Sequence, residues 1–278
     1  MPMENSLALP ASAESGHTVA MPAQPAMPVI SLAQVDKRFA SGLLALRQVS
    51  LAVAAGEFVA LLGPSGCGKS TVLRLAAGLE APSAGRVDAP ALRSGDAAQT
   101  AFVFQEPTLM PWASVFDNVW LPLRLAGRAR AQAESQVRLV LAAVGLGDFA
   151  AAFPAELSGG MKMRASIARA LVTRPQLLLM DEPFAALDEI TRQRLNADLL
   201  QWWAAQKLSA LFVTHSVFEA VFLSQRVLVM GARPGRVITD LCIDEPYPRQ
   251  AEFRTSRRYA AACRELSLAL ESASEAVP

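Results

Sequence analysis

Long apolar runs are missing from this sequence of 278 residues. No stretch of about 18 consecutive apolar residues occurs, so we expect no helix that spans a membrane. A surplus of one charge is missing too, because 26 Lys and Arg oppose 25 Asp and Glu, which leaves a net charge of +1. Such a chain has no overall basic field to attract nucleic acid, and we expect no nucleic-acid partner.

Cysteine and histidine are also scarce. The three cysteines are far apart and show no CxxC spacing, which argues against a disulfide framework or a zinc site and favours a reducing compartment. The first basic residue is Lys37, and Glu4 stands where a secretory signal needs positive charge, so no export signal is expected. We interpret residues 1–28, rich in Pro, Ala and Ser, as a flexible leader.

Short apolar runs alternate with helical patterns along the rest of the chain. Strands are predicted at 29–35, 46–53, 57–62, 101–105, 177–181 and 210–215, with a hairpin over 226–243. Helical spacing predicts helices at 71–79, 129–146, 188–206 and 249–274. Residues 106–175 show little strand signal and are interpreted as a helical insert. The alternation predicts an α/β core with a parallel sheet.

The strongest chemical motif is GPSGCGKST at 63–71, between a predicted buried strand and a predicted helix. It fits G-x-x-x-x-G-K-[ST], in which backbone N–H groups surround phosphates. Lys69 is expected to reach the β- and γ-phosphates of a nucleotide, and the Ser70 hydroxyl to bind Mg²⁺. A chance glycine-rich turn is the alternative, and the strand-loop-helix setting disfavours it. The loop residues predicted to bind the nucleotide are Gly63, Pro64, Ser65, Gly66, Cys67, Gly68, Lys69, Ser70 and Thr71.

Polar residues end three of the predicted strands. Asp181 and Glu182 follow LLLM, so Asp181 is expected to hold Mg²⁺ through water and Glu182 to polarise the attacking water. His215 ends a strand that should run parallel to this one, which favours a γ-phosphate contact over a purely structural role. Gln105 ends strand 101–105, and its amide is expected to contact Mg²⁺ and water.

A second stretch with phosphate-site chemistry lies at LSGG, residues 157–160. Ser158, Gly159 and Gly160 open a predicted helix, where the peptide dipoles favour an anion. Taken alone, the pattern fits a serine N-cap equally well.

In this order, the motifs resemble the ATP-binding subunits of ABC transporters over residues 29–245. The resemblance implies a P-loop NTPase (RecA-like) core with an antiparallel β subdomain and a helical signature subdomain at about 106–175. Residues 246–278 would form a C-terminal helical tail. The resemblance also implies ATP and Mg²⁺ as cofactors and the hydrolysis of ATP to ADP and phosphate.

The resemblance assigns further residues. Phe39 would stack on adenine, and Asp188 would end the D-loop. Ser158 and the two glycines after it would cap the γ-phosphate of an ATP held by the other chain of a head-to-tail homodimer. Met161 and Met163 stand where glutamine is commoner, and Ala186 where serine is frequent, so contacts there depart from the family pattern. The Cys67 thiol at a helix N-terminus is either reactive or inert.

Four stretches, at 105–119, 181–192, 230–237 and 244–249, resemble the nitrate/sulfonate/taurine importer group. This implies two integral-membrane permease subunits, indirectly a solute-binding protein, and a peripheral location on the cytoplasmic face of the inner (plasma) membrane. An importer for a thiamine precursor, or a soluble ABC ATPase outside transport, are the alternatives. The apolar residues expected either to receive a permease helix or to pack in the core are Leu109, Met110, Trp112 and Phe116.

Overall fold

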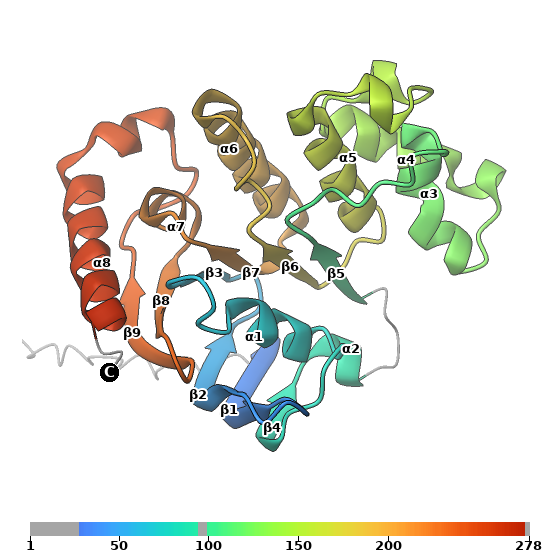
Figure 1. The fold of residues 1–278 in the computed structure, drawn as a ribbon. Coiled ribbons are helices and arrows are strands. Elements are labelled where there is room, and N and C mark those ends of the chain that lie inside the picture. Colours follow the sequence, from blue (N-terminus) through green and yellow to red (C-terminus); the bar gives the residue numbers. More distant parts are fainter. Residues whose placement is uncertain (1–27, 94–98, 276–278) are drawn as a thin grey trace, which may run out of the picture.

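A computed structural model describes residues 28–93 and 99–275. The leader interpreted at 1–28 lies outside these ranges except for Pro28. The chain forms two sheets (Figure 1). The larger has the order β5(Thr100–Val103), β6(Leu177–Asp181), β7(Ser209–Thr214), β3(Phe58–Leu62), β8(Arg226–Gly231) and β9(Arg236–Cys242).

The larger sheet is parallel except at one edge. Strands β5, β6, β7, β3 and β8 pair in parallel, and β9 returns antiparallel to β8 through the predicted hairpin. The prediction of an α/β core with a parallel sheet is therefore confirmed. Because neighbouring parallel strands end at the same edge, residues that follow β3, β6 and β7 are brought together there.

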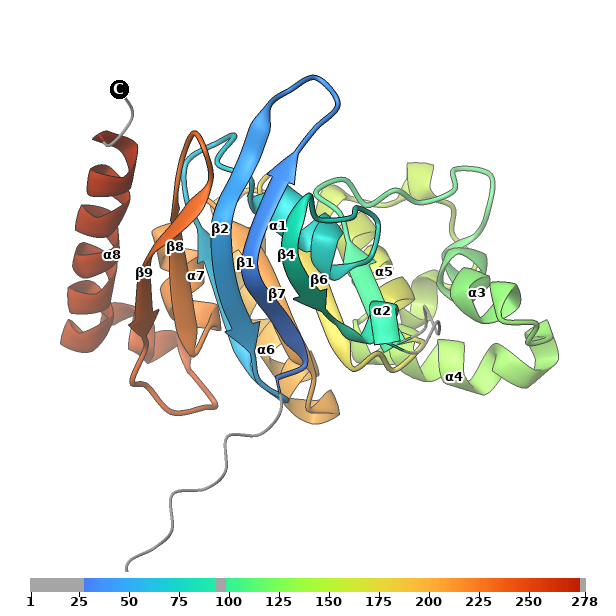
Figure 2. The ribbon, with the colours of Figure 1, turned by 90° about the horizontal axis from the view of Figure 1, so that it is seen from below.

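The smaller sheet is antiparallel, with the order β2(Leu44–Val53), β1(Ile30–Arg38), β4(Ala84–Asp88), and it lies across α1(Lys69–Ala76) (Figure 2). Strand β4 was not predicted, because AGRVD has only one large apolar residue and lies largely exposed. The helix predicted at 71–79 begins two residues earlier, at Lys69.

All regular elements between β5 and β6 are helical. They are α3(Val115–Leu125), α4(Arg130–Ala143) and α5(Gly159–Leu171), with 3₁₀ turns at Gly147–Phe149 and Pro154–Glu156. Together they lie beyond the β5 edge of the large sheet (Figure 1). Strand β5 begins at Thr100 and ends at Val103, so the strand predicted over 101–105 begins one residue and ends two residues too far along the chain.

The remaining helices are α2(Pro90–Arg93), α6(Glu189–Gln206), α7(Val217–Leu223) and α8(Arg257–Glu275), with a 3₁₀ turn at Ala251–Thr255. Helix α7 was not predicted. Helix α8 begins eight residues after the start predicted at 249, and residues 251–255 form the 3₁₀ turn instead. No helix in the described ranges is long and apolar enough to cross a membrane.

The large sheet is buried on both faces. Along β3, Phe58, Ala60 and Leu62 pack into one hydrophobic cluster with the helices α3 to α8. Val59 and Leu61 pack into a second cluster with α1 and the small sheet. Side chains alternate between faces along a strand, so a nearly continuous apolar run is what a doubly covered strand requires.

Candidate nucleotide-binding site

The loop at 63–68 joins β3 to α1 and turns sharply. Gly68 has φ of 95°, a left-handed conformation that a residue with a Cβ adopts only with strain. This turn directs the first backbone N–H groups of α1 toward open space in front of the loop. A helix N-terminus of this kind favours a negatively charged group.

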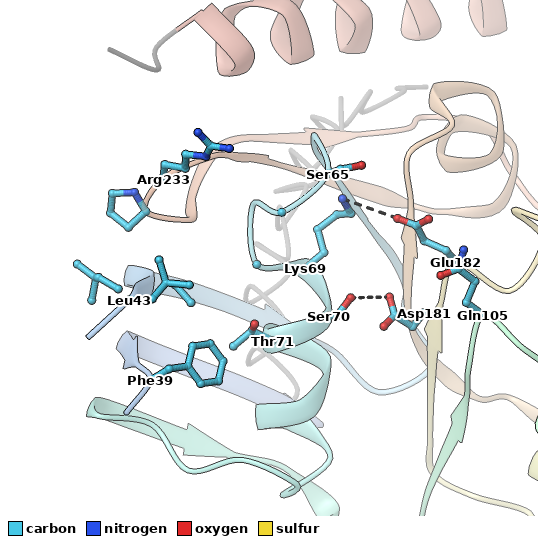
Figure 3. A pocket seen from close by; sticks show the side chains of 15 residues that line it. Phe39, Leu43, Ser65, Lys69, Ser70, Thr71, Gln105, Asp181, Glu182 and Arg233 are labelled. Carbon is cyan, nitrogen blue, oxygen red and sulfur yellow. Dashed lines mark hydrogen bonds and ion pairs between the residues drawn. The ribbon is translucent and has the colours of Figure 1, made fainter. Parts of the chain in front are cut away.

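Lys69 is the buried cation of this loop. Its Nζ donates to the carbonyl oxygens of Gly63, at 2.8 Å, and Pro64, at 2.9 Å. It also lies 3.9 Å from Glu182 Oε1 (Figure 3). The ammonium is thus fixed within the loop beside the end of β6, where it can neutralise phosphate oxygens.

Asp181 ends β6 and faces the first turn of α1. Its Oδ1 accepts a hydrogen bond of 3.0 Å from Ser70 Oγ (Figure 3). Burial raises the pKa of Asp181 above its ordinary value, and the hydrogen bond from Ser70 partly opposes this. A carboxylate and a hydroxyl side by side are ligands that suit Mg²⁺, which usually takes few protein ligands and keeps several waters.

Glu182 and His215 are brought together because β6 and β7 are neighbours that run in parallel. His215 Nδ1 lies 3.1 Å from Glu182 Oε2. Glu182 has φ of 46°, and its backbone N–H donates to Val213 of β7. The strained backbone aims the carboxylate away from Asp181 and toward Lys69 and His215.

Lys69, Ser70, Asp181 and Glu182 border a cavity of about 770 Å³, whereas His215 touches Glu182 but does not itself line the cavity. This volume lies within the range of about 300–1,000 Å³ that is usual for small-molecule sites. Ten of the predicted residues line it: Phe39, Ser65, Gly66, Gly68, Lys69, Ser70, Thr71, Gln105, Asp181 and Glu182. The aromatic ring of Phe39 lies at one end and the two carboxylates at the other (Figure 3). An aromatic surface, a cationic loop and a metal-binding pair fit the base, the phosphates and the Mg²⁺ of a nucleotide in that order.

Several lining residues were missed by sequence reasoning. They are Leu43, Leu44, Ala45, Arg233 and Pro234. Arg233 lies on the turn between β8 and β9, across the cavity from Phe39 (Figure 3). The sequence ARPG was interpreted as a hairpin turn and as part of the resemblance to the importer group, and nothing local indicates that this turn returns to the phosphate loop.

Gly235 holds that turn against the loop. Its N–H donates to Ala45 at 2.9 Å, and its carbonyl accepts from Arg47 at 2.9 Å. A Cβ at this position would lie 2.1 Å from the carbonyl oxygen of Cys67. Only glycine permits such a close approach of two backbones.

Cys67 itself is fully buried. Burial raises the pKa of its thiol, which outweighs the opposing effect of Lys69. A protonated, inaccessible thiol is a poor nucleophile. Of the two sequence-based alternatives, the reactive thiol is therefore wrong and the inert thiol is favoured.

Ser158, Gly159, Gly160 and Asp188 do not line this cavity. Ser158 caps α5 by accepting from the N–H of Met161 at 3.3 Å. Asp188 caps α6 by accepting from the N–H of Thr191 at 2.9 Å, and this hydrogen bond lowers the pKa of the carboxyl. Ser158, Gly159 and Asp188 are exposed. Within one chain Ser158 and Asp188 are helix N-caps, and Gly159 and Gly160 form the start of α5.

The apolar stretch after Gln105 divides into two parts. Phe116 is 4% exposed and belongs to the core of the helical region, so of its two expected roles core packing is the one observed. Trp112 is 77% exposed, and Leu109 packs partly against the core. For Trp112 the alternative of core packing is excluded.

Comparisons with known proteins agree with this geometry. The ABC transporter family profile matches residues 46–185. The nitrate import ATP-binding protein of Synechocystis sp. is 42% identical over 80% of this chain and 85% of its own length. The aliphatic sulfonates import ATP-binding protein of Mesorhizobium japonicum is 48% identical over 78% of this chain and 80% of its own length. The taurine import ATP-binding protein of Rhizobium johnstonii is 46% identical over 74% of this chain and 79% of its own length.

Among solved structures, a component of the cbiONQ ABC transporter complex of Clostridium perfringens superposes with a TM-score of 0.72. The match covers 86% of this chain and 99% of that one at 24% identity. At this identity the likeness shows a common fold.

Proposed function

The chain belongs to the ABC transporter family of ATP-binding proteins, and from this premise we propose that it powers import of a small, anionic solute through separate membrane subunits. Members of this family are ATPases. The observation that carries the site assignment is the meeting of Lys69, Asp181 and Glu182 around one cavity. This meeting at one sheet edge supports the proposal that Lys69 binds phosphate, Asp181 serves as a metal ligand and Glu182 acts as the base.

In the proposed reaction, Lys69 exchanges part of its contact with the carbonyls of its own loop for phosphate oxygens. Ser70 and Gln105 would hold Mg²⁺ directly and Asp181 through water, and the bound ion would supply positive charge that neutralises the phosphates. Phe39 stacks on the adenine. The loop N–H groups of residues 63–71 bind the remaining phosphate oxygens.

Glu182 accepts a proton from the attacking water as the terminal phosphate is transferred. His215 lies 3.1 Å from the Glu182 carboxylate and holds its orientation. The proposed contact of His215 with the γ-phosphate would require the ring to turn toward the cavity, which it does not line. Glu182→Gln should therefore reduce ATP turnover by at least about 100-fold, the usual contribution of a positioned base.

That variant should keep ATP binding and the stability of the fold. The matched control is Glu271→Gln, since Glu271 is exposed on α8 and forms no hydrogen bond or ion pair with residues 28–93 or 99–275. ATP hydrolysis measured by phosphate release separates the two. Normal turnover in Glu182→Gln would show that Glu182 is not the base.

Ser158, Gly159, Gly160 and Asp188 support the proposal of a head-to-tail homodimer. They lie at two helix N-termini and outside the cavity of their own chain. We assign Ser158 and the two glycines to the γ-phosphate of the partner's ATP. Asp188 contributes to the same site from the D-loop.

Ser158→Arg tests the dimer. In a Glu182→Gln background, the variant should bind ATP as a monomer and fail to dimerise with ATP in size-exclusion chromatography. Ser158→Asn retains an N-cap acceptor and should dimerise. If Ser158→Arg formed the same fraction of ATP-dependent dimer as Ser158→Asn, this assignment would be overturned.

The permease contact is assigned to the exposed surface around Trp112. A large exposed aromatic side chain in a chain that binds membrane subunits indicates an interface. Docking there places the protein on the cytoplasmic face of the inner membrane, peripheral to two permease subunits that receive solute from a binding protein.

The solute class rests on the relatives named for nitrate, taurine and aliphatic sulfonates. A deletion strain should lose growth with nitrate as sole nitrogen source, or with taurine or an alkanesulfonate as sole sulfur source. The gene should restore growth and its Glu182→Gln form should not. Normal growth on all three would overturn the anion assignment and leave the ATPase assignment intact.

A further inference from the structure

A second cavity, of about 930 Å³, lies between α6 and residues 247–254. None of the residues that line it lines the nucleotide cavity. One wall is a single face of α6, formed by residues that recur at helical spacing from Ile190 to Ala204. The other wall is Phe222 of α7 and the segment that follows β9.

The lining carries charge of one sign. Three arginines, Arg194, Arg249 and Arg254, border the cavity, and no Asp or Glu does. Arg194 is exposed and forms no hydrogen bond or ion pair with any residue of 28–93 or 99–275. A cationic site with no acidic residue on its walls favours an anion.

Arg254 supplies an unused donor inside the cavity wall. Its guanidinium carbon lies 3.6 Å from the ring centroid of Phe222. Its Nη2 is buried and has no hydrogen-bond partner among the described residues. Buried donors are normally paired, so a free guanidinium nitrogen beside a cavity indicates a missing acceptor.

Arg249 makes the cavity rigid and is not itself free. It is 6% exposed, and it donates to backbone carbonyls at both ends of the wall, from Val221 to Glu245. Tyr247 is fixed in the same way, because its hydroxyl donates to Leu223 at 2.6 Å. The wall opposite α6 is therefore held in place without a ligand.

Apart from the arginines and Gln193, Gln201 and Gln250, the lining is mostly apolar, and it includes Ala197, Leu200 and Ala204 on α6 and Phe222 on α7. We propose that this cavity binds a small amphipathic organic anion. Its carboxylate or sulfonate group would pair with Arg254 and Arg194, and its apolar body would lie between Phe222 and Leu200. A guanidinium presents parallel N–H donors that match such an oxyanion.

A small molecule is favoured over an acidic peptide because the site is a hollow of the size usual for small ligands. The probe is 8-anilinonaphthalene-1-sulfonate, an aromatic sulfonate that fluoresces in apolar surroundings. Titration is done on the full chain with saturating Mg-ADP, which blocks the nucleotide cavity. We expect one binding event, displaced by octanesulfonate and not by uncharged octanol.

Two variants test the position of the site. Arg254→Gln should weaken binding about tenfold, the usual effect of one charge-assisted hydrogen bond. Ala197→Trp should abolish binding by filling the cavity, without touching the guanidinium. Arg264→Gln is the control, because Arg264 is exposed on α8, outside the cavity, and should bind the probe like wild type.

Circular dichroism and ATP binding establish that each variant is folded. Probe affinity unchanged in both Arg254→Gln and Ala197→Trp overturns the proposal. So does the absence of probe binding to the wild-type protein. Displacement by an acidic peptide but not by octanesulfonate would also overturn it and assign the cavity to a protein partner.

Discussion

Gly235→Ala is expected to disturb the nucleotide site from a position about 170 residues away in the sequence. The new Cβ would lie 2.1 Å from the Cys67 carbonyl oxygen and 3.0 Å from the Ala45 carbonyl oxygen. Ordinary carbon–oxygen contacts are about 3.3 Å or longer, so the two backbones must separate by about 1 Å. Neither atom belongs to a flexible side-chain end that could turn aside.

The separation has a calculable cost. It breaks the two hydrogen bonds that join Gly235 to β2, each 2.9 Å long and each contributing about 1 kcal/mol. Overpacking against the loop adds about 1–2 kcal/mol. The free energy of unfolding should therefore fall by about 3 kcal/mol, a large part of the 5–15 kcal/mol typical of a folded domain. ATP affinity should fall about tenfold, because the loop at 63–68 moves with Cys67.

Urea unfolding followed by tryptophan fluorescence measures the first effect, and titration with a fluorescent ATP analogue measures the second. Gly147→Ala is the matched control, because its added Cβ would meet its nearest neighbour, Ala142, at 3.9 Å. A loss below about 0.5 kcal/mol in Gly235→Ala, within the range of ordinary surface changes, together with unchanged ATP affinity, would refute this reasoning.

Three further changes have defined outcomes. Burial raises the pKa of Asp181, so ionised Asp181 makes the folded chain less stable than a neutral side chain would. Asp181→Asn should therefore raise the free energy of unfolding at pH 7, and this gain should disappear as the pH falls through the raised pKa. The same variant should have no ATPase activity. Iodoacetamide at neutral pH should label the exposed Cys242 in the folded protein and spare Cys67, as peptide mass spectrometry would show; equal labelling would contradict the burial argument. Arg249→Met leaves five backbone carbonyls without their donor, and it should lower the free energy of unfolding, measured in urea, by about 3 kcal/mol or more. Arg257→Met, at an exposed position, should change this free energy by less than about 0.5 kcal/mol. Equal effects would show that the buried hydrogen bonds of Arg249 contribute little.

The sequence alone determined the features whose signal is local. The run at 57–62, the loop at 63–71 and the acidic end of LLLMD each combine residue types and spacing that one segment of chain uses by itself. The parallel direction of β6 and β7 was predicted from their composition, because a run that is apolar at nearly every position must be covered on both faces. The motif order then indicated the family and the identity of the cofactor.

Only the tertiary structure decided which distant segments meet. It placed the turn at Arg233 and Gly235 against the phosphate loop, buried the Cys67 thiol, and put Phe116 in the core while leaving Trp112 exposed. It also formed the arginine-lined cavity beside α6. These placements and this cavity depend on contacts between residues that are far apart in the chain. A pattern within one short segment of sequence carries no information about such contacts.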